Sequence, residues 1–292
     1  MKARKRFGQH FLAPAWADKV IAAIAPSRDD YFLEIGPGPG ALTTRLAPRV
    51  RHLTAIEIDR DLAADLRLRL PPNAEVVNGD FMDADLGPYL QTGPLRVAGN
   101  LPYNLSTPIL FKLLALARTS AGRERPGLQT GTFDARADRT GRADPSDPPA
   151  SLIDATVMLQ REVADRLVAR AGTKDYGVLT IFTGLEADVR RVLSLPPGAF
   201  RPAPKVHSAV VRLTFKTSPL PTGAGSIFDP MVRTMFMQRR KTLLNALRPY
   251  ADSIGRDPKS ALDAAGIDPV RRPETLTQQD LLRLVSALAP SV

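Results

Sequence analysis

Glu34-Ile35-Gly36-Pro37-Gly38-Pro39-Gly40 is the stretch that decides the fold of this 292-residue chain. It ends a short apolar run, Tyr31–Ile35, and precedes a segment with helical patterning, Ala41–Ala47. Glycines between a strand and a helix let the backbone pass close to a ligand, and the helix that follows offers free N–H groups. The sequence therefore predicts a nucleotide-type binding turn inside an α/β domain.

Further apolar runs, each bounded by Gly, Pro, Asp or Asn, extend outward from this turn. The expected strands are Tyr31–Ile35, Leu53–Ile58, Ala74–Asn78, Leu95–Ala98 and Ala155–Leu159. Helical patterns such as Asp61–Leu70 separate them, and this alternation indicates a mostly parallel sheet covered on both faces. Val189–Leu195 and Ser208–Phe215 are expected to complete a seven-stranded sheet with an antiparallel end.

Two changes in composition divide the rest of the chain. Residues 118–151 are rich in Arg, Asp, Gly and Pro and hold few large apolar side chains, so a disordered insertion is expected there. Thr217–Gly223 reads as a linker. The amphipathic helices expected beyond it are Met231–Leu247, Ser260–Ala265 and Thr277–Leu288. The predicted domains are thus residues 1–218 and a small all-α domain, residues 219–292.

Composition narrows the functional classes. The formal net charge is +10 and the pI is near 10.2, which favours a polyanionic partner such as nucleic acid. A GC-rich genome is the alternative source of this arginine-rich composition. The chain has no cysteine, which excludes disulfides and thiol chemistry and fits a reducing cytoplasm. No apolar run approaches the roughly 18 residues of a membrane span. His52 and His207 lack a second ligand at suitable spacing, so no metal is expected.

Acidic residues at the ends of two successive strands indicate the ligand. Glu57 follows the glycine turn by about twenty residues, where a carboxylate can accept both hydroxyls of a ribose. Asp80 ends the next strand and can accept from an adenine amino group, although such an acid is also a common helix N-cap. The prolines and the glycine spacing depart from the dinucleotide pattern. We therefore expect S-adenosylmethionine, which has no pyrophosphate, in place of NAD.

Asn100-Leu101-Pro102-Tyr103 follows an expected strand and has the chemistry to hold a base with an exocyclic amine. The Asn100 side-chain oxygen and the Leu101 carbonyl can accept two N–H groups, Pro102 stiffens the turn and Tyr103 can stack on the base. An Asx-Pro turn that merely closes the strand is the alternative. With the cofactor motif upstream, the pattern predicts methyl transfer to a nucleobase nitrogen. An NAD-dependent oxidoreductase would leave this motif unexplained.

Five motifs stand in the order in which they occur in the ribosomal RNA adenine N6-dimethyltransferases. They are Gly8–Leu12, Glu34–Gly40, Asn100–Asn104, Phe200–Val206 and Arg239–Leu244. The chain resembles this family over nearly its whole length except residues 118–151, and is most similar to the bacterial small-subunit (16S rRNA) branch. The resemblance implies a Rossmann-like S-adenosylmethionine-dependent methyltransferase domain plus a helical C-terminal domain. The implied product is two adjacent N6,N6-dimethyladenosines near the 3′ end of small-subunit rRNA.

The resemblance also implies roles for particular residues. Those expected at the cofactor are His10, Leu12, Gly36, Glu57, Asp80 and Asn100. Phe200 is expected to hold the target base against Tyr103. The basic cluster Arg239, Arg240 and Lys241 is expected to bind rRNA phosphates, with a solvated helix face as the alternative.

The expected partner is 16S rRNA within the 30S subunit, bound by a monomer. Two other functions remain open from the sequence alone. One is a ribosome-assembly factor whose binding to the precursor particle matters more than its chemistry. The other is adenine N6-methylation of the large-subunit (23S) rRNA.

Overall fold

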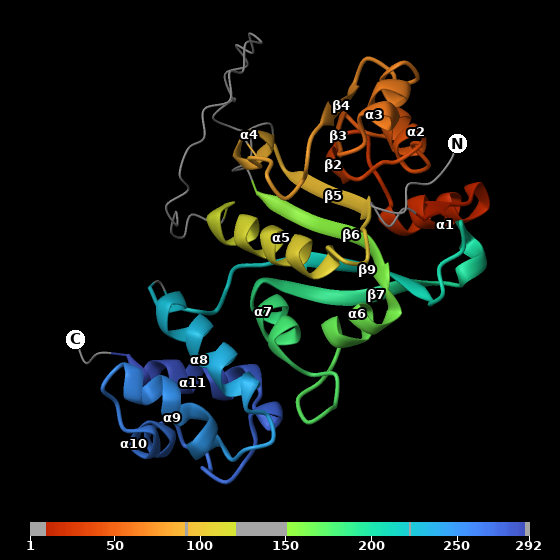
Figure 1. Ribbon diagram of the computed structural model, residues 1–292. Coiled ribbons are helices and arrows are strands. Elements are labelled where there is room, and N and C mark those ends of the chain that lie inside the picture. Colours follow the sequence, from red (N-terminus) through yellow and green to blue (C-terminus); the bar gives the residue numbers. More distant parts are fainter. Residues whose placement is uncertain (1–9, 91–92, 121–150, 222, 290–292) are drawn as a thin grey trace. The chain divides into compact units, whose positions relative to one another are not determined.

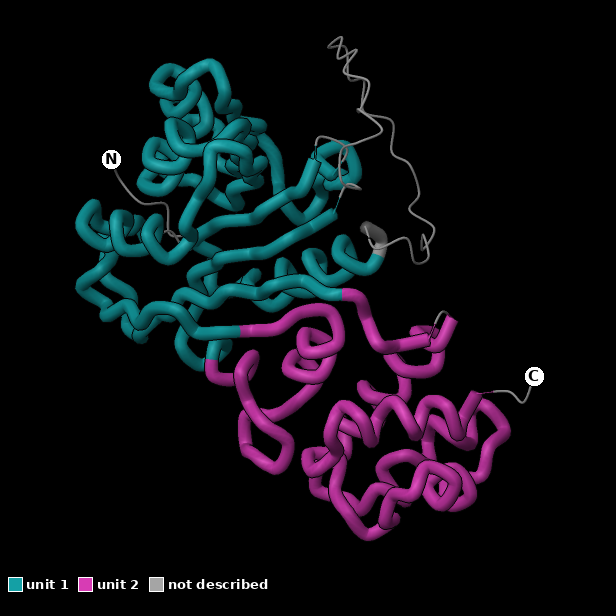
Figure 2. Tube along the Cα trace, turned by 180° about the vertical axis from the view of Figure 1, so that it is seen from behind, with its two compact units in different colours: residues 1–164, 190–216 teal, residues 165–189, 217–292 magenta. Residues whose placement is uncertain are grey.

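The structure is a computed structural model that describes residues 10–90, 93–120, 151–221 and 223–289. The chain forms two compact units, residues 1–164 with 190–216 and residues 165–189 with 217–292 (Figure 2). The predicted boundary at residue 218 differs from this division, because it assigns residues 165–189 to the first domain. Of the expected insertion, residues 121–150 lie outside the described residues, while Arg118 belongs to a helix that continues to Ser120.

A seven-stranded sheet organises the first unit, in the order β4-β3-β2-β5-β6-β9-β7 (Figure 1). Its strands are β2 (Tyr31–Ile35), β3 (His52–Glu57), β4 (Ala74–Asn78), β5 (Leu95–Asn100), β6 (Leu152–Gln160), β7 (Ala187–Leu195) and β9 (Ser208–Phe215). The strands from β4 to β6 pair in parallel, and β9 runs antiparallel to β6. The predicted mostly parallel sheet with an antiparallel end is confirmed.

Helices cover both faces of this sheet. The helices of the first unit are α1 (Pro14–Ile24), α2 (Thr43–Leu46), α3 (Arg60–Arg67), α4 (Gly87–Leu90) and α5 (Ser106–Ser120), and α6 (Arg161–Leu167) begins in it. The apolar side of α1 packs on alternate residues of the strands, with Phe32, Ala98, Met158 and Val210 in the same buried cluster. Figure 1 shows α5 across the opposite face. Two short strands, β1 (Phe11–Leu12) and β8 (Phe200–Arg201), pair antiparallel.

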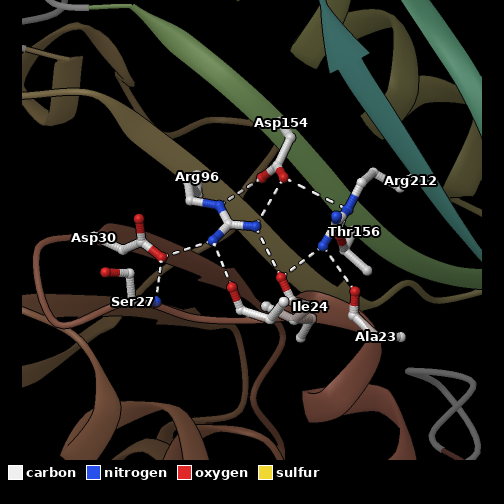
Figure 3. A network of polar contacts seen from close by, with 9 residues as sticks. Ala23, Ile24, Ser27, Asp30, Arg96, Asp154, Thr156 and Arg212 are labelled. Carbon is white, nitrogen blue, oxygen red and sulfur yellow. Dashed lines mark hydrogen bonds and ion pairs between the residues drawn. The ribbon is translucent and has the colours of Figure 1, made fainter.

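A charged cluster fastens the end of α1 to the sheet (Figure 3). Arg96 on β5 makes a bidentate pair with Asp154 on β6, at 2.8 and 2.9 Å, and donates to Asp30 at 2.6 Å. Arg212 on β9 donates to two carbonyls in the last turn of α1, at 2.6 and 2.7 Å, and Arg96 donates to the Ile24 carbonyl at 2.9 Å. The two guanidinium groups therefore satisfy carbonyls that the helix end leaves without partners, and they complement its dipole.

The second unit is helical. It comprises α7 (Val178–Glu186), α8 (Gly225–Met237), α9 (Leu243–Ser253), α10 (Pro258–Ala264) and α11 (Gln278–Leu288). Phe182 of α7 meets Phe228 of α8 edge-to-face, with centroids 5.7 Å apart, and the Tyr176 hydroxyl donates to the Leu276 carbonyl at 2.8 Å. These contacts explain why residues 165–189 group with the C-terminal helices. No helix within the described ranges has the length and apolar character needed to cross a membrane.

The expected single helix Met231–Leu247 is wrong, because the structure divides it into α8 and α9. Gln238 leaves helical geometry, and Thr242 is extended before α9 begins. The N–H groups of Leu243 and Leu244 bond to carbonyls at Arg271 and Pro269, at 2.7 and 3.1 Å. A tertiary contact thus takes donors that a continuous helix would have used. The basic cluster consequently lies on the turn between two helices and not on a helix face.

We predict that Asp154→Asn lowers the free energy of unfolding by about 3 kcal/mol, because it removes the one carboxylate that pairs with Arg96 and also faces Arg212 in a largely buried site. Urea denaturation followed by fluorescence of Trp16, the sole tryptophan and part of α1, measures this change. Asp65→Asn is the control, since Asp65 pairs with Arg69 at the surface and should contribute less than about 0.5 kcal/mol. Equal effects of the two substitutions would contradict the prediction.

Candidate cofactor and base-binding site

A pocket opens where β2, β3 and β5 end, and the N-terminal segment forms one of its walls. Most of the predicted site residues line it, namely His10, Leu12, Gly36, Glu57, Asn100, Leu101, Pro102 and Tyr103. Glu34, Ile58 and Met158 line it as well. The structure therefore brings the predicted cofactor motif and the predicted base-holding motif into one cavity.

The glycine turn needs its glycines for two reasons. Gly36, Gly38 and Gly40 have φ angles of 61°, 57° and 88°, a region that side chains disfavour. A Cβ at position 40 would lie 2.5 Å from a methyl of Leu66. The Gly38 N–H donates to the Glu57 carboxylate at 2.8 Å, so the turn is bonded directly to the end of β3.

Glu57 is buried, and its carboxylate already accepts hydrogen bonds from the backbone. One carboxylate oxygen accepts from Gly38 and the other from the Asp59 N–H, also at 2.8 Å. Burial raises the pKa of Glu57, and these backbone N–H groups oppose that rise. A carboxylate has about four lone-pair sites, so further acceptor capacity remains. Glu57 can thus hold the turn in place and still accept from a ligand hydroxyl.

Glu34, for which no site role was predicted, is the second carboxylate of the pocket. It is 2% exposed, and its Oε2 atom has no hydrogen-bond partner among the described residues. Burial raises the pKa of Glu34 to about 8, Thr43 lowers it and the nearby Glu57 raises it. An acid inside the apolar strand Tyr31–Ile35 was the signal that could have identified it.

The charge of the pocket indicates its ligand. Two carboxylates line it, and no Lys or Arg is among its lining residues in the part of the chain that the structure describes. A pyrophosphate would face both acids unpaired, whereas a cationic ligand would neutralise them. S-adenosylmethionine, which carries a sulfonium and an ammonium group, fits this donor set and a dinucleotide does not.

Asn100 is held in one orientation. Its Nδ2 donates to the His10 carbonyl at 2.7 Å, which leaves the amide oxygen as the atom available to a ligand amine. The Leu101 N–H bonds to the Met158 carbonyl at 3.0 Å, and the next turn is closed through the Pro102 carbonyl. The Leu101 carbonyl is therefore not the acceptor of that turn. At Gly99, a Cβ would lie 2.7 Å from the Ile35 carbonyl, so only glycine fits there.

Tyr103 is held by two contacts that the sequence did not predict. Its hydroxyl bonds to the Ser208 hydroxyl at 2.7 Å, and its ring stacks on His10 with centroids 5.4 Å apart and planes inclined by 24°. Burial raises the pKa of Tyr103. No local pattern singles out Ser208, because only the sheet brings β9 beside the Asn100 motif.

Phe200, which is expected to hold the target base against Tyr103, does not line the pocket, and its contact with a base remains a prediction. Phe200 is 0% exposed, belongs to the core cluster and is not among the pocket residues. The pairing of β8 with β1 sets Phe200 opposite Leu12 and directs its side chain into the core under the N-terminal segment. In its place, the aromatic neighbour of Tyr103 is His10.

Asp80 also lies outside the set of pocket residues. One of its carboxylate oxygens accepts from the Met82 N–H at 2.8 Å, which is the turn-capping arrangement that the sequence left open. The Gly79 N–H bonds to the Glu57 carbonyl at 3.0 Å, so Asp80 follows the strand beside Glu57. Its contact with an adenine amino group remains a prediction.

The three residues of the basic cluster in the second unit differ in exposure and in pairing. Arg239 forms an ion pair with Glu274 at 3.3 Å and donates to the Lys174 carbonyl at 3.1 Å. Arg240 and Lys241 are exposed. Their positions suit phosphate contacts, which remain a prediction. Within the described ranges, no three His, Asp or Glu side chains gather in a way that could hold a metal ion.

Known proteins similar to this chain in sequence are ribosomal RNA methyltransferases, in agreement with the cofactor that the pocket fits. A family model described as "Ribosomal RNA adenine dimethylase" matches residues 1–289. The chain is 39% identical to the "Ribosomal RNA small subunit methyltransferase A" of Aromatoleum aromaticum, over 99% of this chain and 95% of that protein. It is 40% identical to the protein of the same name from Nitrosococcus oceani, over 97% and 95%.

Two solved structures share the fold over nearly the whole chain. One is a dimethyladenosine transferase from Plasmodium falciparum, with a TM-score of 0.68 and 25% identity over 94% of this chain and 96% of that one. The other is the 23S rRNA methyltransferase ErmE, with a TM-score of 0.64 and 28% identity over 95% and 99%.

We predict that Glu34→Gln stabilises the ligand-free protein, and increasingly so with rising pH. The pKa of Glu34 is about 8 in the folded state and 4.5 ordinarily, so the folded state binds the carboxyl proton more tightly. This tighter binding contributes fully to the free energy of unfolding below pH 4.5, and the contribution is lost as the pH rises through 8. Glutamine has no charge to bury, so its advantage should grow between these values and level off above pH 8, at a few kcal/mol as an order of magnitude. Urea unfolding at pH 5, 7 and 9 measures it, with the exposed Asp29→Asn as control. A difference that does not vary with pH would refute the assignment.

Proposed function

Because the chain belongs to the ribosomal RNA adenine dimethylase family, we propose that it dimethylates N6 of two adjacent adenosines in the 3′-terminal hairpin of 16S rRNA, using S-adenosylmethionine. The observation that carries this proposal is the single pocket that joins the carboxylate-lined glycine turn to Asn100–Tyr103. The small-subunit methyltransferases among its relatives support the choice of RNA.

The donor half of the pocket is acidic and partly apolar. When bound, S-adenosylmethionine supplies an electrophilic methyl group. Glu57 would accept the ribose hydroxyls through its remaining lone pairs, and the unpartnered Oε2 of Glu34 would face the cofactor's positive charge. Ile58, which is 45% exposed and lines the pocket, offers an apolar surface beside them.

The acceptor half addresses the weak nucleophilicity of an adenine amine, whose lone pair is delocalised into the ring. The Asn100 amide oxygen and the Leu101 carbonyl would accept the two N–H groups and so direct the lone pair out of conjugation toward the methyl group. The bond from Asn100 to the His10 carbonyl fixes the amide for this task before the base arrives. No strong general base is needed, since the nitrogen becomes acidic once it is methylated.

The exposed cations of the second unit would supply part of the RNA contact. Arg240 and Lys241 are adjacent on the turn between α8 and α9, and among the described residues neither has an ion pair like that of Arg239 with Glu274. We propose that they bind rRNA phosphates, that the protein acts on the 30S particle as a monomer, and that it works in the cytoplasm. The net charge of +10 supports a polyanionic partner.

We predict that Asn100→Ala lowers kcat/KM for methyl transfer by about 10²- to 10³-fold, since it removes an oriented acceptor that acts on the reacting amine. Transfer of labelled methyl groups to purified 30S and 50S particles and to naked rRNAs measures both rate and substrate. Gln279→Ala, an exposed amide, is the control.

The same assay separates the other functions. Binding of the Asn100→Ala protein to 30S precursors should persist, which would show that docking and chemistry are separable. Labelling of large-subunit RNA alone would overturn the proposed substrate. Absence of methyl transfer by the parent protein to every RNA, with particle binding intact, would favour an assembly factor.

We predict that the double change Arg240→Ala with Lys241→Ala weakens rRNA binding. It should also reduce the magnitude of the slope of log K against log salt by about 1.5, because a protein that makes two fewer phosphate contacts releases fewer counterions on binding. Filter binding at salt concentrations from about 50 to 200 mM, over which such affinities change strongly, would measure this slope. Lys259→Ala removes an exposed cation of the same unit and should leave the slope unchanged. An unaltered slope in the double variant would exclude the turn from the interface.

A further inference from the structure

A lysine on α5 holds the loop that carries Asp80. The Lys112 ammonium donates to the carbonyls of Phe81, Met82 and Ala84, each at 2.7 Å. An ammonium has three N–H donors, so all three are spent on this one loop, residues 80–86. A lysine that served only solubility would point its charge to water.

The bonds of Lys112 and Asp80 interlock. The Met82 N–H donates to the Asp80 carboxylate at 2.8 Å, while the carbonyl of the same residue accepts from Lys112. The N–H groups of Asp83 and Ala84 bond to the Asp80 carbonyl at 3.1 and 3.0 Å. The lysine and the acid therefore both stabilise the same tight turn, and no described residue bonds to the second Asp80 oxygen, Oδ2.

The charges around the lysine are consistent with this role. Burial lowers the pKa of Lys112, and the carboxylates of Asp83, Asp80 and Asp85 oppose that change. The ammonium also lies over the Phe81 ring, 5.3 Å from its centroid, and Phe81 is 5% exposed. Removing the ammonium would leave three loop carbonyls without their donor beside three acids.

The location connects the loop to the cofactor site. Asn78 on β4 is in register with Glu57 on β3, so Asp80 lies two residues beyond the partner of the proposed ribose-binding acid. The exposed Ile58 follows Glu57 and lines the pocket. An adenine on Ile58, with its ribose at Glu57, would present its edge toward the loop of Asp80.

We propose that Lys112 is a positioning residue for recognition of the cofactor's nucleobase: it holds residues 80–86 so that the Asp80 carboxylate meets the adenine amino group. This inference rests on the proposed function and goes beyond it by naming the residue that makes the cofactor site selective for adenine. A carboxylate accepts from the amine of adenine but faces the oxygen of hypoxanthine unfavourably. Selectivity between these two bases thus reports where Asp80 points.

The test compares S-adenosylhomocysteine with S-inosylhomocysteine, with each Kd measured by calorimetry on the full chain. We expect the parent to prefer the adenosyl ligand by about tenfold or more, the size of a hydrogen bond to a charged group. Lys112→Met should reduce this preference by about tenfold, with little change in the affinity for the inosyl ligand. Lys19→Met, an exposed lysine of the same unit, should keep the parental preference.

A purely structural role for Lys112 would weaken both ligands alike and leave the preference unchanged, and that result would overturn the proposal. Lys112→Arg serves if the methionine variant does not fold, since a planar guanidinium cannot direct three donors to the same three carbonyls. An undiminished preference in the arginine variant would likewise overturn it.

Asp80→Asn separates this inference from the wider function. Loss of the preference in Asp80→Asn but not in Lys112→Met would reject the lysine alone. An unchanged preference in Asp80→Asn would reject the adenine contact together with the inference. Neither result alters methyl transfer to the 30S particle by the parent protein, which tests the proposed function independently.

Discussion

The period of two along each strand is the constraint on which the rest of this structure depends, and β5 shows it most directly. Arg96, Ala98 and Asn100 point to the face of the sheet that α1 covers. The first enters the charged cluster at the end of α1, the second packs in the core and the third lines the pocket. A slip of one residue in the pairing of β5 would exchange all three for residues of the opposite face.

The neighbouring strand repeats this arrangement. Asp154 pairs with Arg96 at one end of β6, and Met158 lies opposite Asn100 at the other, in parallel register. The segment that contains His10, whose carbonyl bonds to Asn100, leads directly into α1. The pocket therefore lies at the start of this layer of the chain, and the charged cluster lies at the end of α1. The ionic network thus holds the end of α1 on the same layer to which Asn100 holds the N-terminal segment.

Features that depend on local sequence or on the parallel order of the strands were predictable, and individual side-chain contacts made across the antiparallel strands were not. The strand Tyr31–Ile35 and the glycine turn follow from composition and spacing, and so does the meeting of Glu57 with Asn100, because parallel strands end at one edge. Ser208 reaches Tyr103 only through the antiparallel insertion of β9, which no short motif encodes. The complete burial of Phe200 was likewise not predictable, because an exposed and a buried aromatic look alike in a sequence.

Net charge describes the partner of this protein but not its site. The chain carries an excess of ten positive charges, yet Glu34 and Glu57 make the pocket acidic. A nucleobase is neutral and a phosphate is an anion, so a pocket lined by two acids would disfavour a phosphate more than a base. Burial of Glu34 lowers the stability of the folded chain near neutral pH. A site that binds a cation needs such an acid, so stability is lower where function requires it. The exposed side chains Arg240 and Lys241 lie on a surface turn, outside this acidic cavity, where the proposed phosphate contacts would be open to them.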